Sequence, residues 1–134
     1  MRLVITTPTA VVAEIDPVAH VRAADASGAF GILPGHADLL TVLALSVVSW
    51  RTPDGREGHA AVRGGVLTVK GGNVVRIATR EAVAGDDLAT LEGRVLASLR
   101  AADEEERRQR SDSARLEAAA IHRIRRFLSP GGER

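Results

Sequence analysis

Residues 63–77 read RGGVLTVKGGNVVRI, and this stretch decides the fold class. Two short apolar runs, 66–69 and 74–77, stand on either side of the sequence GGN at 71–73. Glycine adopts the positive φ that a tight reversal needs, and valine and isoleucine favour extended backbone. The stretch therefore predicts two antiparallel strands joined by a short turn.

The same pattern recurs on the N-terminal side of this hairpin. Apolar runs at 3–5 and 11–13 flank TPT at 7–9, and the sequence TPDG at 52–55 combines a proline with a glycine. Proline sets φ at the second position of a turn, and glycine accepts positive φ later in it. Short strands with frequent turns indicate antiparallel β structure rather than alternating strands and helices. We predict a β-sandwich of two antiparallel sheets over residues 1–82.

The composition permits such a body and excludes several kinds of site. Hydrophobic residues make up 45% of the 134 residues and aromatic residues 2%, so the core must be aliphatic. The chain has no cysteine, which excludes disulfides, thiolate metal sites and cysteine nucleophiles. A net charge of +1 provides no general attraction to nucleic acid, and no apolar run reaches the roughly 20 residues that span a bilayer. We therefore expect neither a nucleic-acid partner nor a membrane span.

The charged residues divide the chain into two parts. Residues 1–79 carry 13 charged side chains, whereas the shorter stretch 80–134 carries 22. Most glycines and prolines lie in the first part, and an alanine-rich, charged sequence fills the second. This shift predicts a boundary between residues 82 and 83, with a second, helical domain over 83–134.

The second part begins with the apolar period of a helix. Apolar residues recur three and four positions apart at Leu88, Leu91, Val95, Leu99 and Ala102. Asp86 and Asp87 precede them, where carboxylates suit the positive end of the helix dipole. Three acid-before-base pairs follow at a spacing of four residues, which supports an exposed helix: Asp103/Arg107, Glu104/Arg108 and Glu106/Arg110.

A second amphipathic stretch follows a run of cap-forming residues. Ser111-Asp112-Ser113 interrupts the charged pattern, and the next apolar face consists of Leu116, Ala120, Ile124 and Phe127. Two amphipathic helices joined by a short break predict an αα-hairpin. A single long bent helix is the alternative.

A search for catalytic and metal-binding residues finds no recognisable constellation. His20, His36, His59 and His122 lack the spacing of a zinc site, and the glycines form no phosphate-binding loop. Ser46 and Ser49 lie in a strand-like run rather than in a nucleophile elbow. We expect no catalytic residue, no metal and no cofactor, so a role in contacts with other proteins is favoured.

One segment indicates more than a fold class, because it resembles the signature of a known family. Residues 31–41 read GILPGHADLLT, which resembles the G-I-x-P-G-H-x-P-L-L-T signature of the epsilon subunit of F-type ATP synthases. The sequence RGGVLTV at 63–69 is similar to the S-G-G-x-L-E-V strand of that family, and GNVV at 72–75 to its N-x-V-T turn. The resemblance extends over nearly the whole chain, because the order of sandwich and helices also matches.

The resemblance implies a non-catalytic rotor subunit of the central stalk. Its sandwich would grip the gamma subunit and rest on the c ring, and its helices would regulate ATP hydrolysis through the catalytic alpha/beta hexamer. Such a subunit would be peripheral, at the cytoplasmic face of the bacterial plasma membrane. From the residues alone, a free-standing β-sandwich interaction module with a helical tail is the alternative, and a stable complex with gamma would distinguish the two.

The resemblance also implies a set of partner-contact residues around the loop. They are Gly28, Phe30, Gly31, Pro34, Gly35 and His36. In this interpretation the proline and glycines hold a turn, and Phe30, Ile32 and Leu33 provide apolar surface. The alternative is that Phe30 and Ile32 pack inward and His36 bonds a nearby backbone group.

The sequence departs from the family pattern at two kinds of position. ATP-binding members carry I/L-D-x-x-R-A early in the first helix, where residues 88–93 here read LATLEG. The aspartate is replaced by Ala89 and the arginine by Glu92, whose carboxylate repels phosphate, so we expect no ATP site of that kind. In the loop, Asp38 replaces the usual proline, and Ala29 stands where relatives often carry a polar or acidic residue.

Overall fold

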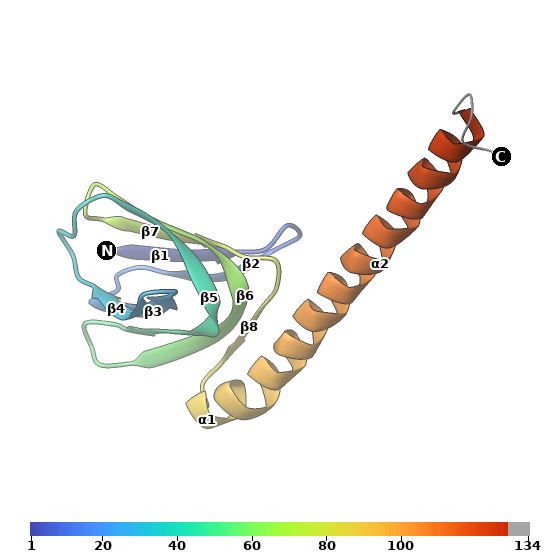
Figure 1. Cartoon of the computed structure of the whole chain (residues 1–134). Coiled ribbons are helices and arrows are strands. Elements are labelled where there is room, and N and C mark those ends of the chain that lie inside the picture. Colours follow the sequence, from blue (N-terminus) through green and yellow to red (C-terminus); the bar gives the residue numbers. More distant parts are fainter. Residues whose placement is uncertain (129–134) are drawn as a thin grey trace. The chain divides into compact units, whose positions relative to one another are not determined.

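The computed structural model describes residues 1–128, with side chains described as far as residue 124. Strands form the N-terminal part and helices the C-terminal part (Figure 1). The strands are β1 (Arg2–Thr6), β2 (Val11–Ile15), β3 (His20–Asp25), β4 (Gly28–Ile32), β5 (Leu39–Arg51), β6 (Glu57–Lys70), β7 (Val74–Ala78) and β8 (Ala82–Gly85). The helical segments are α1 (Leu88–Thr90), the π-helical turn η1 (Leu91–Val95) and α2 (Leu96–Leu128).

The strands form a sandwich-like body from one hydrogen-bonded sheet. Their order is β2-β1-β7-β6-β5-β3-β4, and β8 pairs with β6. The long strands β5 and β6 connect the layers, because one half of β6 pairs with β7 and the other half with β8. The predicted β-sandwich is confirmed, with two differences. The sheet is continuous rather than two separate sheets, and β1 and β7 run parallel to each other.

The stretch 63–77 forms the predicted hairpin and also bends the sheet. Its strands pair with Lys70 opposite Val74 and Val66 opposite Ala78. Within β6, Gly65 has φ of 115°, and a Cβ there would lie 2.1 Å from the carbonyl oxygen of Ala78. Neither this backbone conformation nor this close approach tolerates a side chain, so the glycine is required where the strand passes between layers.

The core between the layers is aliphatic, as the composition predicts. Its largest fully buried side chains are Leu3, Ile5, Val18, Val21, Ile32, Val48, Val62, Leu67, Val69, Val75 and Ile77. Phe30 and Trp50 are half-buried at its margin. Burial of each large aliphatic side chain contributes about 1.5–3 kcal/mol, so this cluster dominates the stability of the strand body.

The first helical turns belong to the same compact unit as the strands. Leu91 and Leu99 are buried against Ala61 of β6, and Val95 and Leu96 pack around them. The chain divides into compact units between Arg100 and Ala101. The apolar period therefore marks a buried helical face from Leu91 to Leu99, whereas Leu88 at its start is exposed, and the first turn of this face is π-helical.

The predicted αα-hairpin is wrong, and the alternative of one long helix is correct. Helix α2 is continuous through Ser111, Asp112 and Ser113. Serine and aspartate cost only about 0.5 kcal/mol each in a helix interior, and the Asp112 carboxylate lies 3.9 Å from the Arg115 guanidinium instead of capping a new helix. The Phe127 side chain lies outside the described residues.

Ion pairs along α2 follow the sequence prediction in two of three cases. Arg107 pairs with Asp103 at 3.0 Å, and Arg110 with Glu106 at 3.7 Å. Arg108 pairs with Glu105 at 3.0 Å rather than with Glu104, which places acid and base three residues apart. Spacings of three and of four residues both bring side chains together on a helix surface. The prediction was therefore wrong only in taking Glu104, rather than its neighbour Glu105, as the partner of Arg108.

Candidate functional site

The predicted contact loop begins as an edge strand of the sheet. Strand β4 pairs only with β3 and is the last strand in the order. Gly28 and Gly31 are exposed, Phe30 is half-buried against the core, and Ile32 is fully buried at 0% exposure. The expectation that Ile32 provides surface is therefore wrong, because the pleat that exposes Gly31 turns the next side chain inward.

A tight turn follows the strand. The His36 backbone N–H donates to the Leu33 carbonyl oxygen at 3.1 Å, with Pro34 and Gly35 at the central positions. Gly35 has φ of 86°. Proline second and a positive-φ glycine third are the signature of a type II turn, which holds Leu33, Pro34 and Gly35 at the surface.

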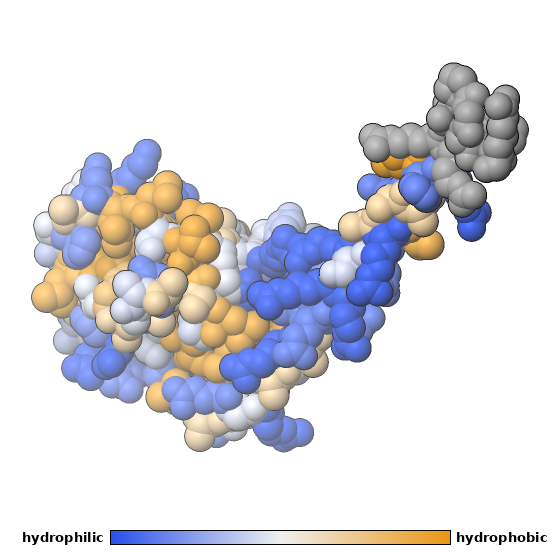
Figure 2. All heavy atoms as spheres, viewed as in Figure 1, coloured by the Kyte–Doolittle hydropathy of each residue, from blue (hydrophilic) through white to orange (hydrophobic). Residues whose placement is uncertain are grey.

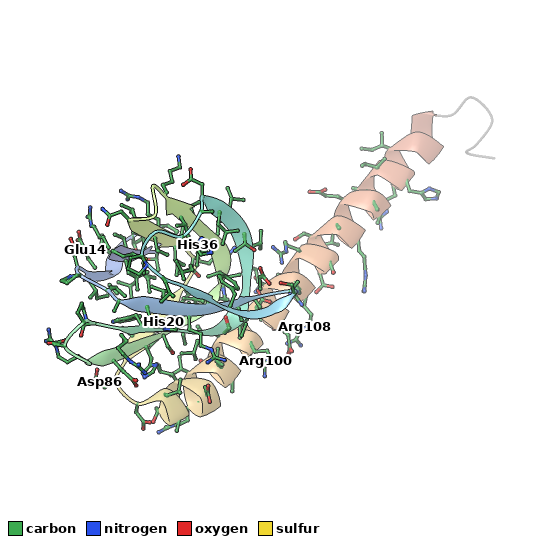
Figure 3. All side chains as sticks on the ribbon, turned by 90° about the vertical axis from the view of Figure 1, so that its left-hand side faces the viewer. Glu14, His20, His36, Asp86, Arg100 and Arg108 are labelled. Carbon is green, nitrogen blue, oxygen red and sulfur yellow. The ribbon has the colours of Figure 1, made fainter. Side chains whose placement is uncertain are left out.

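His36 is half-buried beside this turn (labelled in Figure 3). Its Nδ1 lies 2.6 Å from the carbonyl oxygen of the next residue, Ala37. This distance indicates that Nδ1 carries a proton and donates it, leaving Nε2 uncommitted among the described residues. The histidine thus bonds a backbone group, as the alternative sequence interpretation expects, and keeps one ring nitrogen for an outside contact.

The loop is fixed against the turn between β6 and β7. The Gly35 backbone N–H donates to the Gly72 carbonyl oxygen at 2.8 Å. The Gly71 backbone N–H donates to the Asp38 Oδ1 at 2.9 Å. A Cβ on Gly72 would lie 2.8 Å from the Gly35 Cα, so the two backbones touch. The glycine pair at 71–72 and the loop at 33–38 therefore form one rigid corner.

Sequence reasoning treated Asp38 as a minor departure and missed this role. We expect Asp38→Ala to lower the free energy of unfolding by about 1 kcal/mol, because a hydrogen bond between a charged group and the backbone is lost. Urea unfolding followed by circular dichroism measures the change. Asp38→Asn keeps an acceptor oxygen and should retain most of the stability. Equal losses in both variants would show that the bond to Gly71 is not what holds the loop.

An apolar patch lies on the outer face of the sheet beside this corner. We define the outer patch as Leu40 and Val42 of β5, Val66 of β6 and Ala78 of β7. Leu40 and Val42 are 71% and 66% exposed. Val42 pairs with Val66, which pairs with Ala78, so the side chains form a contiguous row across three strands. Figure 2 shows apolar surface gathered over the strand body.

The outer patch is the part of the site that sequence reasoning missed. Its signal is the run LLTVL at 39–43, which lacks the alternation of polar and apolar residues that a strand with one wet face shows. Exposed apolar surface of this kind marks a protein-binding site in soluble proteins. The candidate site is therefore wider than the loop.

A hydrogen-bonded aspartate ties the turn before β4 to the strand that carries the patch. The Asp25 carboxylate accepts bonds from the Ser27 hydroxyl, from the Thr41 hydroxyl at 2.7 Å and from the Ser27 backbone N–H at 2.9 Å. The Ser27 hydroxyl, followed by that of Thr41, holds the pKa of Asp25 below its ordinary value. These bonds favour the ionised carboxylate.

The depressed pKa of Asp25 predicts that the strand body loses stability in acid. The pKa of Asp25 is lower in the folded state than in the unfolded state, so the ionised carboxylate adds to the free energy of unfolding. This contribution is fully present above the unfolded-state pKa near 3.8, and it is lost as pH falls through the lower folded-state pKa. The melting temperature of the Asp25→Asn variant should be lower than that of the wild type at pH 7, and the gap should narrow below pH 4. Glu104→Gln, which removes an exposed carboxylate on α2, should show no such convergence.

The positions of the lost nucleotide motif lie at the start of the helical region. Ala89 in α1 and Glu92 in η1 are both exposed. Asp87 caps α1, with its carboxylate accepting bonds from the Ala89 backbone N–H at 3.1 Å and the Thr90 hydroxyl at 2.6 Å. The expected carboxylate at the helix start is thus Asp87, and it is committed to its own helix.

Residues 1–128 contain no group of three or more acidic or histidine side chains placed to hold a metal ion. No described helix has the length and hydropathy of a transmembrane segment.

Comparison with known proteins gives a consistent result. A family model described as the beta-sandwich domain of the ATP synthase Delta/Epsilon chain matches residues 1–85. The ATP synthase epsilon chain 2 of Cereibacter sphaeroides is 47% identical, covering 99% of this chain and 92% of that protein. The ATP synthase epsilon chain 2 of Paraburkholderia xenovorans is 40% identical, covering 97% of this chain and 94% of that protein.

Two solved structures share the fold. One is a chain in a mitochondrial ATP synthase structure from Euglena gracilis that contains OSCP, F1 and the c-ring. It aligns with a TM-score of 0.59 and 23% identity, covering 96% of this chain and 66% of that one. The other is a chain in a central stalk and c-ring structure from Tetrahymena thermophila, with a TM-score of 0.54, 20% identity and coverage of 77% and 90%.

Proposed function

We propose that this chain, which belongs to the ATP synthase epsilon chain family, joins the gamma subunit to the c ring in the central stalk of its synthase. As a member of this family it is a subunit of the complex and is not itself catalytic. The observation that carries the proposal is the 47% identity to an epsilon chain over 99% of the sequence.

The surface of the strand body supports two contacts. We assign the outer patch to gamma, because a contiguous apolar row suits a permanent interface between subunits. We assign the loop to the c ring, with Gly28, Phe30, Gly31, Pro34, Gly35 and His36 as contact residues. A rigid corner and an edge strand favour this role, since a preformed loop binds without an ordering cost.

Co-expression with gamma tests the proposal. A central-stalk subunit should elute with gamma as a stoichiometric complex on sizing chromatography. A free-standing interaction module would elute alone at its own mass, and that result would contradict the assignment. A gamma subunit expressed with its own known epsilon chain is the positive control for the assay.

The subcellular position follows from the assembly. We propose that the chain lies at the cytoplasmic face of the bacterial plasma membrane as a peripheral subunit, since both relatives that match nearly its full length are bacterial proteins. Both are named epsilon chain 2, which favours a subunit of a second ATP synthase in its cell. A second epsilon gene in the source genome would support that assignment, and its absence would contradict it.

Helix α2 is proposed to regulate ATP hydrolysis by contacting the alpha/beta hexamer. The motivating feature is the dense charge of residues 103–126, which includes several arginines. Deletion of residues 111–134 leaves the ion pairs between 103 and 110 intact and removes the rest of the helix.

This deletion should raise the ATPase rate of the assembled enzyme by about fivefold, the lower end of typical coupling between sites. Steady-state hydrolysis by the purified complex measures the effect. Removal of only residues 129–134 serves as the control and should leave the rate closer to that of the wild type. An unchanged rate after the longer deletion would exclude an inhibitory helix.

A further inference from the structure

A row of polar side chains crosses the outer face of the sheet outside the outer patch. Strand register pairs Arg22 of β3 with Ser49 of β5, and Ser49 with His59 of β6. Residues two apart on a strand share a face, so a second row, formed by His20, Arg51 and Glu57, lies beside the first. Adjacent strands are about 4.8 Å apart, which places these side chains within reach of one ligand.

Ser49 and His59 form a fixed hydrogen-bonded pair within these rows. The Ser49 Oγ lies 2.7 Å from the His59 Nδ1, and His59 is only 9% exposed. If the hydroxyl donates, the His59 Nε2 carries the proton and is a free donor. If Nδ1 donates, the serine O–H is free instead. In either tautomer the pair keeps one donor for a ligand.

These side chains surround a pocket of about 220 Å³. Leu88 of α1 forms part of its wall, so the pocket lies within the compact unit of residues 1–100. A second pocket of about 170 Å³ lies beside β4 and is lined by Phe30 and Gly31. His20 and Arg22 line both pockets, which makes them the shared wall.

The charge of the pocket is positive. Arg51 and Glu57 neutralise each other, with a distance of 3.0 Å between the Arg51 Nη2 and the Glu57 Oε1. The Arg22 guanidinium makes no hydrogen bond or ion pair with any described residue, so its charge is uncompensated. The carboxylate of Asp87, next to Leu88, bonds its own helix and does not line the pocket. The pocket is therefore lined by the unpaired guanidinium of Arg22, by the imidazoles of His20 and His59 and by the Arg51–Glu57 ion pair.

Gly31 gives His20 its place in this wall (His20 is labelled in Figure 3). A Cβ on Gly31 would lie 2.9 Å from the His20 Nε2, so the imidazole occupies space that any other residue would fill. The glycine that the sequence assigned to partner contact thus also positions a polar ring. This close fit holds the ring against the sheet.

We propose that this pocket binds a phosphate-class oxyanion. A guanidinium, an imidazole and a hydroxyl-histidine pair converging from adjacent strands supply the charge and the several donors that a tetrahedral anion accepts. The ligand is either free inorganic phosphate or the terminal phosphate of a nucleotide, which share this chemistry. The site lies on the strands and shares Leu88 with the motif stretch 88–93, but the motif positions Ala89 and Glu92 do not line it. It does not depend on the proposed role in the stalk.

Titration of the isolated full chain with inorganic phosphate tests the proposal. Amide chemical shifts are followed at constant ionic strength, with chloride replaced by phosphate. We expect saturable shifts that include residues of β3, β5 and β6, and binding at least tenfold weaker in Arg22→Gln. Arg76→Gln removes an exposed arginine on β7, outside the pocket, and should bind like the wild type.

Three results would overturn the proposal. They are shifts that do not saturate, equal losses in the Arg22 and Arg76 variants, and saturable shifts confined to other strands.

The same titration with ADP identifies the source of the phosphate. If ADP binds more tightly than inorganic phosphate and its binding also depends on Arg22, the ligand of the pocket is a nucleotide. If ADP binds equally well or more weakly than inorganic phosphate, the ligand is free phosphate. Ser49→Ala, which removes the hydroxyl from the hydrogen-bonded pair with His59, should also weaken binding. Because gamma is absent, failure here would leave the stalk assignment untouched.

Discussion

Val42→Asp is expected to weaken the complex with gamma strongly while the chain itself remains folded. Val42 is 66% exposed at the centre of the outer patch, so the carboxylate is solvated in the free subunit. In the complex it would be buried against apolar surface without a partner, which is among the costliest changes an interface can undergo. We expect affinity to fall by about 100-fold, or roughly 2.8 kcal/mol, as measured by co-purification and by titration with gamma.

Val11→Asp is the matched control for this variant. Val11 is 60% exposed on β2, at one edge of the strand order, and does not belong to the outer patch. It introduces the same charge into an exposed strand position and should leave the affinity unchanged. If Val42→Asp binds gamma normally, the outer patch is not the interface, and the loop would have to carry the contact alone.

Gly65→Ala should strongly destabilise the strand body, although it adds only one methyl group. The new Cβ would lie 2.1 Å from the Ala78 carbonyl oxygen, on a backbone with φ of 115°. Steric overlap with main-chain atoms and strain at positive φ add, giving a loss of about 3 kcal/mol or more. Relative to a typical total of about 5–15 kcal/mol, this loss is large enough to leave a substantial unfolded fraction on warming.

Gly55→Ala separates the two causes. Gly55 has φ of 88°, but no atom lies within 4 Å of where its Cβ would stand. This variant carries the backbone strain without the collision and should lose only about 1 kcal/mol. Urea unfolding of both variants by circular dichroism gives the difference. Equal losses would show that β6 relaxes at the bend and that close approach to β7 is not required.

The loop illustrates how far the sequence predicts the site. Pro34 and Gly35 specify a surface turn by their own backbone preferences, and the structure places both at the surface. Whether Ile32 points inward depends on its pairing with Val21 of β3, which lies in the core. Periodicity over a five-residue strand rich in glycine cannot fix that register. The contact role of the loop stays a prediction.

In the helical region, too, local sequence predicts some features and leaves others undecided. The apolar spacing around Leu91 and Leu99 predicts a buried helical face, and these residues do pack on Ala61. The choice between a hairpin and one helix at residues 111–113 is nearly balanced locally, because serine and aspartate serve in caps and are tolerated in helices. Such a choice is decided by which surfaces pack together, and local sequence carries little information about that.

Local sequence was sufficient to establish the strand-and-turn pattern of the first part, the aliphatic nature of the core, the helical character of the second part and the family signature. The strand, turn and helix patterns depend on residues close in the chain, and the core type and the family signature are read from composition and motif. Long-range pairing was needed to establish that Leu40 and Val42 face outward, that Asp38 holds Gly71 and that Ser49 meets His59. These features join residues on different strands, so they exist only once the folded sheet has set the register.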